Sequence, residues 1–320
     1  MLMKKLVLKE SKIFPANISG FFAALGAYVI WGIFPLYMKA VAHIPVMEVV
    51  VYRVLWSLPI ALGIIIVIGH MHALRDALMQ PKMVAMAFLT SALITANWSI
   101  YIWAIANNHA VDAALGYYIN PLVNVMLALV FLHERLNSWQ WFSIALAFVA
   151  VFILTINAGG LPWIAILLPV TFGFYAFFRK SLPIGPTEGF ALETLIMTIP
   201  ALIGCGYFIA TGEDYFFHST WKDAGLLVLA GPFTAIPFIL FAVGAKMLNL
   251  TTLGLMQYLT PTFLFLIAIF VFHEPFSPVQ LFAFSLIWLS LVVYTAASLS
   301  MKKQRQTKDT IIELKKIPEK

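Results

Sequence analysis

Leu115 to Glu134 reads LGYYINPLVNVMLALVFLHE, and 140 residues later Leu255 to Glu274 reads LMQYLTPTFLFLIAIFVFHE. Each stretch is an apolar run of helix length that contains one proline and ends in the charged dipeptide His-Glu. The residues that recur are Tyr118, Pro121, Ala128, His133 and Glu134, matched by Tyr258, Pro261, Ala268, His273 and Glu274. Because one offset of 140 residues relates the two stretches without insertions, we predict that the chain consists of two copies of one unit.

The same offset relates residues on both sides of these two runs. Matched pairs are Gln140 and Gln280, Phe142 and Phe282, Thr155 and Thr295, Glu48 and Glu188, Leu55 and Leu195, and Ala61 and Ala201. We therefore expect a first repeat over residues 17–158 and a second over residues 159–299. A short segment, 1–16, precedes them, and a basic tail, 300–320, follows.

Hydrophobic residues make up 62% of the chain and charged residues 11%, against roughly 45–50% and about 25% in soluble domains. Apolar runs recur along the whole chain, and each has about the 20 residues that a helix needs to cross a bilayer core. A soluble protein of 320 residues has no core large enough to bury them all. We therefore predict an all-α integral membrane protein with ten transmembrane helices, near residues 17–38, 46–69, 83–106, 111–132, 138–157, 161–178, 188–210, 224–245, 251–272 and 278–299.

Basic residues fall into alternate connections between these spans, from Lys4 to the Lys-rich tail after Ser300. The positive-inside rule then places both termini in the cytoplasm. MLMKKLVLKESK is a cytoplasmic lead and not a signal peptide, because the apolar run behind it is too long. Since each repeat has five spans, the second enters the membrane inverted, as in carriers that alternate between inward-open and outward-open states. The tail is expected to lie at anionic headgroups; the alternative is a helix that binds a partner.

Two ionisable residues fall inside expected spans, Arg53 in VVVYRVLWSL and Glu193 in FALETLIM. They occupy the same place in the two repeats, and ionisable groups at membrane depth normally face a cavity or a partner. The span boundaries place them about 10 Å apart along the membrane normal. That separation suits a small zwitterion, with Arg53 on its anionic group and Glu193 on its ammonium. The alternative is a pair of locally satisfied charges that holds helices together.

Polar and aromatic side chains crowd the neighbouring spans. Asn120 and Asn124 stand on one helix face, and Pro121 between them frees a backbone carbonyl one turn earlier. Such a helix can line a binding site, or its amides can join neighbouring helices. The other candidate substrate-binding residues are Asn97, Trp98, Tyr101, Tyr117, Gln257 and Tyr258. The prolines inside expected spans are candidate hinges, namely Pro121, Pro232, Pro237 and Pro261.

The sequence argues against metal, nucleotide and nucleic-acid chemistry. His133-Glu134 and its copy lack the second histidine that a zinc protease needs, so we interpret both dipeptides as helix-end charges and predict no metal site. There is no G-x-x-x-x-G-K-[ST] and no glycine fingerprint, so we expect no cofactor. The net charge of +6 follows the membrane topology, so no nucleic-acid partner is expected. A single cysteine, Cys205, excludes an internal disulfide.

The first repeat carries NWSIYIWAIANNH and GYYINPLVNVMLALVFLHERL, and the second carries TAIPFILFAVGAKMLNLTTLGLMQYLTPT and FVFHEPFSP. Together these stretches resemble the RarD-type permeases of the drug/metabolite transporter superfamily, in which each half is an EamA repeat. The resemblance covers roughly residues 18–300. It implies a ten-helix permease of the bacterial inner membrane with a central cavity between its halves. The chain departs from the family pattern at His133 and His273, where a small residue, often glycine, is expected.

These observations predict a secondary transporter, an exporter of a small polar or zwitterionic metabolite, amino acid or drug, and no enzyme. The expected partners are the small-molecule substrate, membrane lipid and, as a candidate coupling ion, a proton released by Glu193. The oligomeric state is left open and is compatible with a monomer. The alternatives are a multipass membrane enzyme, which usually clusters His, Asp or Ser at one membrane face, and a non-transporting receptor or resistance determinant.

Overall fold

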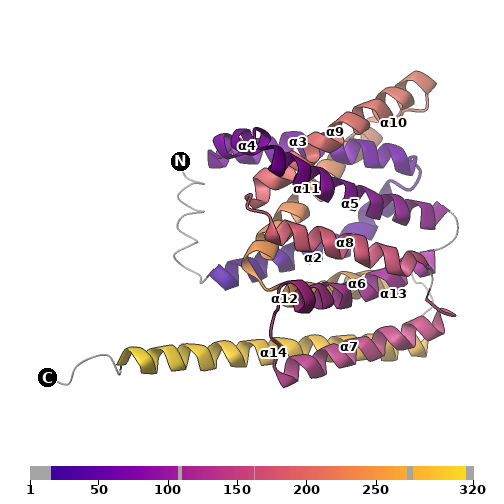
Figure 1. Cartoon of the computed structure of the whole chain (residues 1–320). Helices are drawn as coiled ribbons and strands as arrows, with labels where there is room; N and C mark the ends of the chain where they lie inside the picture. Colours follow the sequence, from indigo (N-terminus) through magenta and orange to yellow (C-terminus); the bar gives the residue numbers. More distant parts are fainter. Residues whose placement is uncertain (1–15, 107–109, 162, 272–276, 315–320) are drawn as a thin grey trace.

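The protein is described by a computed structural model over residues 16–106, 110–161, 163–271 and 277–314, and in these ranges every regular element is a helix (Figure 1). The elements are α2 (Ala16–Ala40), α3 (Val46–Ile68), α4 (Met71–Leu78), α5 (Pro81–Ala106), α6 (Ala110–Phe131), α7 (Ser138–Asn157), α8 (Trp163–Ser181), α9 (Pro186–Thr211), α10 (Tyr215–His218), α11 (Trp221–Met247), α12 (Leu250–Met256), α13 (Leu259–Phe270) and α14 (Pro278–Leu314).

Most of these helices are long and apolar enough to cross a membrane. Within the described ranges nine segments meet this description, and Leu115–Phe131 of α6 is a shorter apolar helix. The outer faces of these helices carry many large apolar side chains, as a lipid environment requires. The membrane class predicted from the sequence is therefore confirmed.

The helices pack in combinations that repeat along the chain. The offset of 140 residues carries α2 onto α8 and α5 onto α11; α2 packs against α11, and correspondingly α8 packs against α5. Likewise α6 packs on α8, and the equivalent α12 and α13 pack on α2. The last helix of each half, α7 and α14, pair along one side of the bundle (Figure 1). Ser143 and Ser290 join this pair, because each hydroxyl donates to the backbone carbonyl of the other residue, at 2.7 and 2.8 Å.

One additional helix and one longer helix differ from the expected spans. A short helix, α4, lies between the second and third expected spans, and it buries Leu74 and Ala77. The last helix does not end near residue 299 but continues to Leu314. The physical reason is the absence of a helix breaker, since no glycine or proline occurs from Val279 until Pro318. The first part of the predicted tail is thus a helical extension of the last span.

The ninth expected span, 251–272, is divided into α12 and α13 by a break at Gln257 and Tyr258. Pro261 explains this position, because proline has no N–H for the carbonyl four residues earlier and its ring crowds that carbonyl. The carbonyl of Gln257 accepts instead from the N–H of Thr260, at 3.1 Å. α6 remains one continuous helix through the equivalent proline, Pro121. The two halves therefore differ in backbone shape at this point.

At one end of the bundle, two lysines join the C-termini of α8 and α11. The ammonium of Lys180 donates to the carbonyls of Ala245, at 3.2 Å, and Leu248. The ammonium of Lys246 donates in return to the carbonyls of Lys180, at 3.2 Å, and Leu182. Each lysine thus satisfies terminal carbonyls of the other helix, which lack partners inside a helix. We call this arrangement the lysine cross-cap and this end of the bundle, where α14 also ends (Figure 1), the tail end.

At the opposite end, α10 begins with Asp214 as its N-cap. The carboxylate accepts the backbone N–H groups of Phe216 and Phe217, at 3.1 and 2.9 Å, and the Tyr52 hydroxyl, at 3.1 Å. Burial raises the pKa of Asp214, but the hydrogen bonds from Phe217, Phe216 and Tyr52 outweigh it and leave the pKa below its ordinary value. Asp214 is therefore a charged cap at neutral pH.

Candidate functional site

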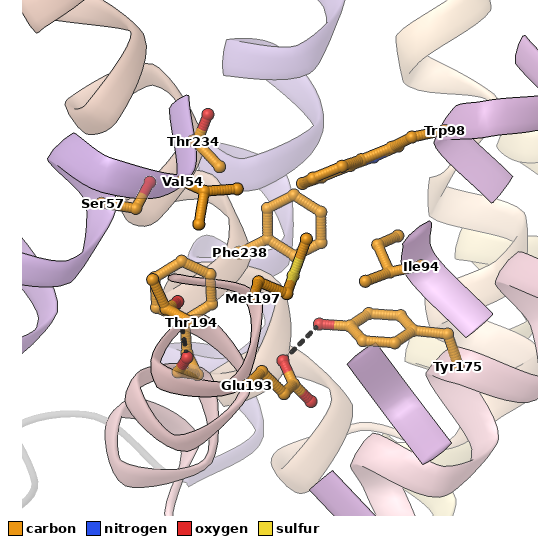
Figure 2. A pocket seen from close by; sticks show the side chains of 11 residues that line it. Val54, Ser57, Ile94, Trp98, Tyr175, Glu193, Thr194, Met197, Thr234 and Phe238 are labelled. Atoms are coloured by element: carbon orange, nitrogen blue, oxygen red, sulfur yellow. Dashed lines mark hydrogen bonds between the residues drawn. The ribbon is translucent and has the colours of Figure 1, made fainter. Parts of the chain in front are cut away.

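A cavity lies in the interior between α3, α5, α8, α9 and α11 (Figure 2). It offers about 20 Å³ to the centre of a water molecule, which is room for about one water. Its walls are mainly aromatic and aliphatic, with one carboxylate and three hydroxyl groups besides that of Tyr175. The lining residues are Val54, Ser57, Ile94, Trp98, Tyr175, Phe190, Glu193, Thr194, Met197, Thr234 and Phe238.

Most of this lining obeys the offset that relates the two repeats. Four pairs of lining residues are separated by 140 positions: Val54 and Thr194, Ser57 and Met197, Ile94 and Thr234, and Trp98 and Phe238. α3 and α5 of the first half contribute one member of each pair, and α9 and α11 of the second half contribute the other. The cavity therefore lies where equivalent helices of the two halves meet.

Glu193 is the charged residue in the cavity wall. Its side chain projects from α9, and its Oε2 accepts the hydroxyl of Tyr175 at 3.3 Å (Figure 2). Its Oε1 lies 3.5 Å from Nη1 of Arg179. The residue is only 3% exposed. A carboxylate so fully removed from water needs a cationic or hydrogen-bonded partner, and here it has both.

Arg179 was not among the candidate residues, because its position suggested a solvated charge in the connection after the sixth span. It lies instead inside α8 and is 1% exposed. α8 and α9 are joined by a short connection, which brings the last turn of α8 beside the early turns of α9. The sequence could have indicated this ion pair, because a basic residue, Arg179, precedes the short connection and a carboxylate, Glu193, follows two helical turns after it.

Arg53 lies behind the cavity wall. Its Nε donates to the hydroxyl of Thr234 at 2.9 Å, and that hydroxyl donates in turn to the carbonyl of Ala230 at 2.8 Å. The guanidinium carbon lies 4.7 Å from the ring centre of Trp98 and 5.1 Å from that of Phe34, within the range of cation–π attraction. Two of these neighbours, Thr234 and Trp98, line the cavity itself.

Glu193 thus lines the cavity, Arg53 lies behind its wall, and the described residues show no ion pair between the two. Among the described side chains, the ion pair of Glu193 is with Arg179. The rings of Tyr101 and Tyr117 contact each other at 5.8 Å between centres. Neither tyrosine lines the cavity.

The candidate amides are placed differently, because their hydrogen bonds join helices. Nδ2 of Asn97 donates to the carbonyl of Leu168 at 2.8 Å and to the hydroxyl of Thr171 at 2.9 Å, both in α8. Nδ2 of Asn124 donates to Oε1 of Gln257 at 2.8 Å, which connects α6 to the break between α12 and α13. Neither amide lines the cavity.

Two further candidates, Asn120 and Tyr258, are buried outside the cavity lining. The amide oxygen of Asn120 and the hydroxyl of Tyr258 have no hydrogen-bond partner in the part of the chain that the structure describes. At the same place α12 approaches α6 closely: a Cβ added to Gly254 would lie 2.7 Å from Cβ of Asn124 and 3.1 Å from the carbonyl oxygen of Pro121. Only glycine permits this contact.

The dipeptide His133-Glu134 follows the end of α6, and its carboxylate caps another helix. The carboxylate of Glu134 accepts the N–H groups of Leu250 and Thr251, at 2.7 and 3.2 Å, and so caps the N-terminus of α12. Such carboxylates stabilise the first turn of a helix. The repeat-related His273 and Glu274 lie outside the described residues.

Comparison with known proteins agrees with this architecture. The sequence profile described as the EamA-like transporter family matches residues 18–156. An uncharacterised transporter of Pseudomonas aeruginosa is 39% identical over 86% of this chain and 93% of the relative. Protein RarD of Escherichia coli is 34% identical over 86% of this chain and 93% of the relative. A protein of known crystal structure, 18% identical, matches the fold with a TM-score of 0.67 over 88% of this chain and 96% of that one.

Apolar spans around a small interior cavity define a multipass helical membrane protein, and the Pseudomonas relative is called a transporter. The chain belongs to the EamA-like transporter family and is a permease of the RarD type.

Proposed function

We propose that the protein is a secondary carrier that exports a small polar or zwitterionic metabolite, amino acid or drug by alternating access. The supporting observation is the paired lining of the cavity, to which equivalent residues of the two halves both contribute. A cavity built in this way is exposed to alternate sides when the halves exchange conformations. We place the carrier in the bacterial inner membrane, with both termini in the cytoplasm and ten spans in two inverted repeats, 17–158 and 159–299.

In this proposal Arg53 and Glu193 bind opposite ends of the substrate. Arg53 takes the anionic group with its planar fork, which a lysine cannot reproduce, and Trp98 and Thr234 hold that fork in place. Glu193 takes the ammonium, and it releases a proton if transport is coupled to one. The cavity as described admits about one water, so its walls must move apart to admit a substrate.

Flux through proteoliposomes tests the carrier. Vesicles are loaded with a mixture of amino acids, small metabolites and drugs, and the external medium is assayed by mass spectrometry. At least one zwitterionic solute should leave faster from vesicles that hold the protein than from empty ones. New chemical products without flux would favour an enzyme, and neither flux nor products would favour a non-transporting receptor or resistance determinant.

Variants of the two charges test the site. Arg53→Lys should fold but transport poorly, and Glu193→Gln should alter both affinity and the pH dependence of flux. Lys222→Ala, an exposed lysine at the start of α11, is the control. If the single variants that fold transport normally, Arg53 and Glu193 are structural residues and the site assignment is wrong.

Pro121, Pro232, Pro237 and Pro261 are the proposed hinges. Pro261→Ala should slow flux more than it weakens substrate binding, because it returns an N–H to the carbonyl of Gln257 and stiffens the break. The exposed Pro45, which precedes α3, supplies the control variant Pro45→Ala. Normal flux with lost binding in Pro261→Ala would assign the residue to the site instead.

A further inference from the structure

The ion pair between Arg179 and Glu193 is incompletely bonded. Arg179 is fixed by a hydrogen bond from Nη2 to the carbonyl of Pro186, at 2.8 Å. Its approach to Glu193, at 3.5 Å, is longer than a hydrogen bond. Nε and Nη1 of Arg179 and Oε1 of Glu193 have no hydrogen-bond partner among the described residues, although all three are buried. A buried ion pair with this geometry lacks the hydrogen bonds that normally offset the free-energy cost of removing both charges from water.

Gly189 is the residue that admits Arg179 to this position. The guanidinium lies directly against its Cα, so an added Cβ would overlap Nη1 and lie 3.0 Å from Cζ. Any other residue at 189 would displace the guanidinium from Glu193. Gly206 in the same helix faces open space, with no atom within 4 Å of an added Cβ.

We propose that Glu193 and the aromatic cavity wall form a subsite for the ammonium group of the substrate. While the cavity is empty, Arg179 is the counter-ion of the Glu193 carboxylate. This rests on the proposed function and names the chemical class that the subsite selects, an amine attached to an apolar body. Binding of the amine releases Arg179, so Arg179 is an internal competitor of the substrate.

The cavity lining supports an amine over an anion or a neutral solute. Trp98, Tyr175, Phe190 and Phe238 contribute aromatic rings to the same cavity wall as the one carboxylate, and ring faces attract an ammonium. The cation on the other side, Arg53, is covered by Trp98 and Phe34. The end of the cavity at Glu193 is therefore suited to a positive charge.

Competition follows from charge balance. Arg179 and Glu193 together are neutral, and a substrate ammonium would leave one uncompensated positive charge in a buried site. Like charges a few ångströms apart repel strongly where water is excluded, so one cation must withdraw.

The test compares two probes of equal size, phenethylamine, which is an ammonium at neutral pH, and phenethyl alcohol, which is neutral. Binding to the purified protein is measured by calorimetry, and the melting temperature is recorded with and without each probe. The wild type should bind the amine at least about tenfold more tightly than the alcohol, and Glu193→Gln should reduce this ratio to about threefold or less. Equal affinities in the wild type, or a ratio that survives Glu193→Gln, overturn the subsite.

Two variants test the role of Arg179. Arg179→Gln removes the competing charge, and Gly189→Ala displaces it, so each should bind the amine at least about threefold more tightly than the wild type. The amine should also raise the melting temperature of both variants more than that of the wild type, because it supplies the missing cation. Gly206→Ala should behave as the wild type. If the folded variants bind the amine no more tightly than the wild type, Arg179 is a structural counter-ion. That result would overturn the proposed competition.

Flux separates failure of this inference from failure of the carrier. If proteoliposomes transport solutes but show no preference for amines, the carrier stands and the ammonium subsite is wrong. If nothing is transported while amine binding depends on Glu193, the subsite stands and the transport proposal is wrong.

Discussion

His133 is held in a backbone conformation that favours glycine. Its φ is +49°, and the N–H of Glu134 reaches back to the carbonyl of Ala128, at 3.1 Å, in the bond that closes the end of α6. An L-residue in this region is disfavoured by about 1 kcal/mol relative to glycine. The resemblance to the family led us to expect a small residue, often glycine, at this position, and the positive φ of His133 gives the physical reason.

His133→Gly should therefore raise the free energy of unfolding by about 1 kcal/mol, seen as a higher melting temperature in detergent. His133→Ala is the matched control, since it removes the imidazole but keeps the Cβ. A glycine variant no more stable than the alanine variant would contradict this explanation.

Asp214 predicts a dependence on pH. Its pKa is lowered below the ordinary value of 3.8, so its stabilisation is complete above that value and is lost as the pH falls through the lower folded-state pKa. Asp214→Ala should lower the free energy of unfolding by about 1 kcal/mol at neutral pH.

The difference in melting temperature between Asp214→Ala and the wild type should narrow as the pH falls below 3.8. Glu213→Ala, which removes the same charge from the exposed neighbouring residue, serves as control. A difference that stays constant down to the lowest accessible pH would show that the charge of Asp214 does not contribute.

Among the helices, the lengths of the apolar runs located most of the elements, because length and apolar character decide where a chain crosses a bilayer. What it could not supply were pairings decided by tertiary contacts. Asn124 and Gln257 were both candidates, but that they bond each other depends on the approach of α12 to α6 at Gly254. Arg179 was missed for the same reason, because a basic residue near a helix end is usually solvated and only the neighbouring helix buries it.

The lysine cross-cap should contribute to helix packing at the tail end. Lys180→Ala removes charge-assisted hydrogen bonds to two carbonyls, and we expect it to lower the free energy of unfolding by about 1–2 kcal/mol. Lys222→Ala is again the control, because that side chain is exposed. Equal melting temperatures for the two variants would show that water replaces the lysine without loss.

For the whole molecule, the membrane class and the duplicated apolar pattern follow from the sequence, whereas the cavity does not. Arg53 and Glu193 were predicted as site residues from their depth and repeat equivalence; Glu193 lines the cavity, and Arg53 contacts its wall through Thr234. Asn97 and Asn124 do not line the cavity because of how their helices are rotated about their own axes. Sequence predicts this rotation from an amphipathic pattern, which is weak in these apolar helices.

The inverted topology predicts labelling from opposite sides of the membrane. Cysteines introduced by Ser138→Cys and Glu213→Cys in a Cys205→Ala background lie at exposed positions at opposite ends of the bundle. In intact cells an impermeant maleimide should label position 213, and position 138 only after the cells are opened. Equal labelling of both in intact cells would contradict the topology.

The lysine cross-cap has a consequence for how the carrier divides its time between states. Two identical inverted halves would give the inward-open and outward-open states the same free energy, but the counterparts of Lys180 and Lys246 in the first half are Ala40 and Ala106, which have no side-chain donor. Closing the tail end therefore gains bonds that closing the other end lacks. A bias of about 1.4 kcal/mol is tenfold in population, so under the proposed alternating-access mechanism we expect the empty protein to rest facing away from its tail end. Its apparent affinity for substrate is then higher on that side, because no free energy is spent on reorienting the protein before binding.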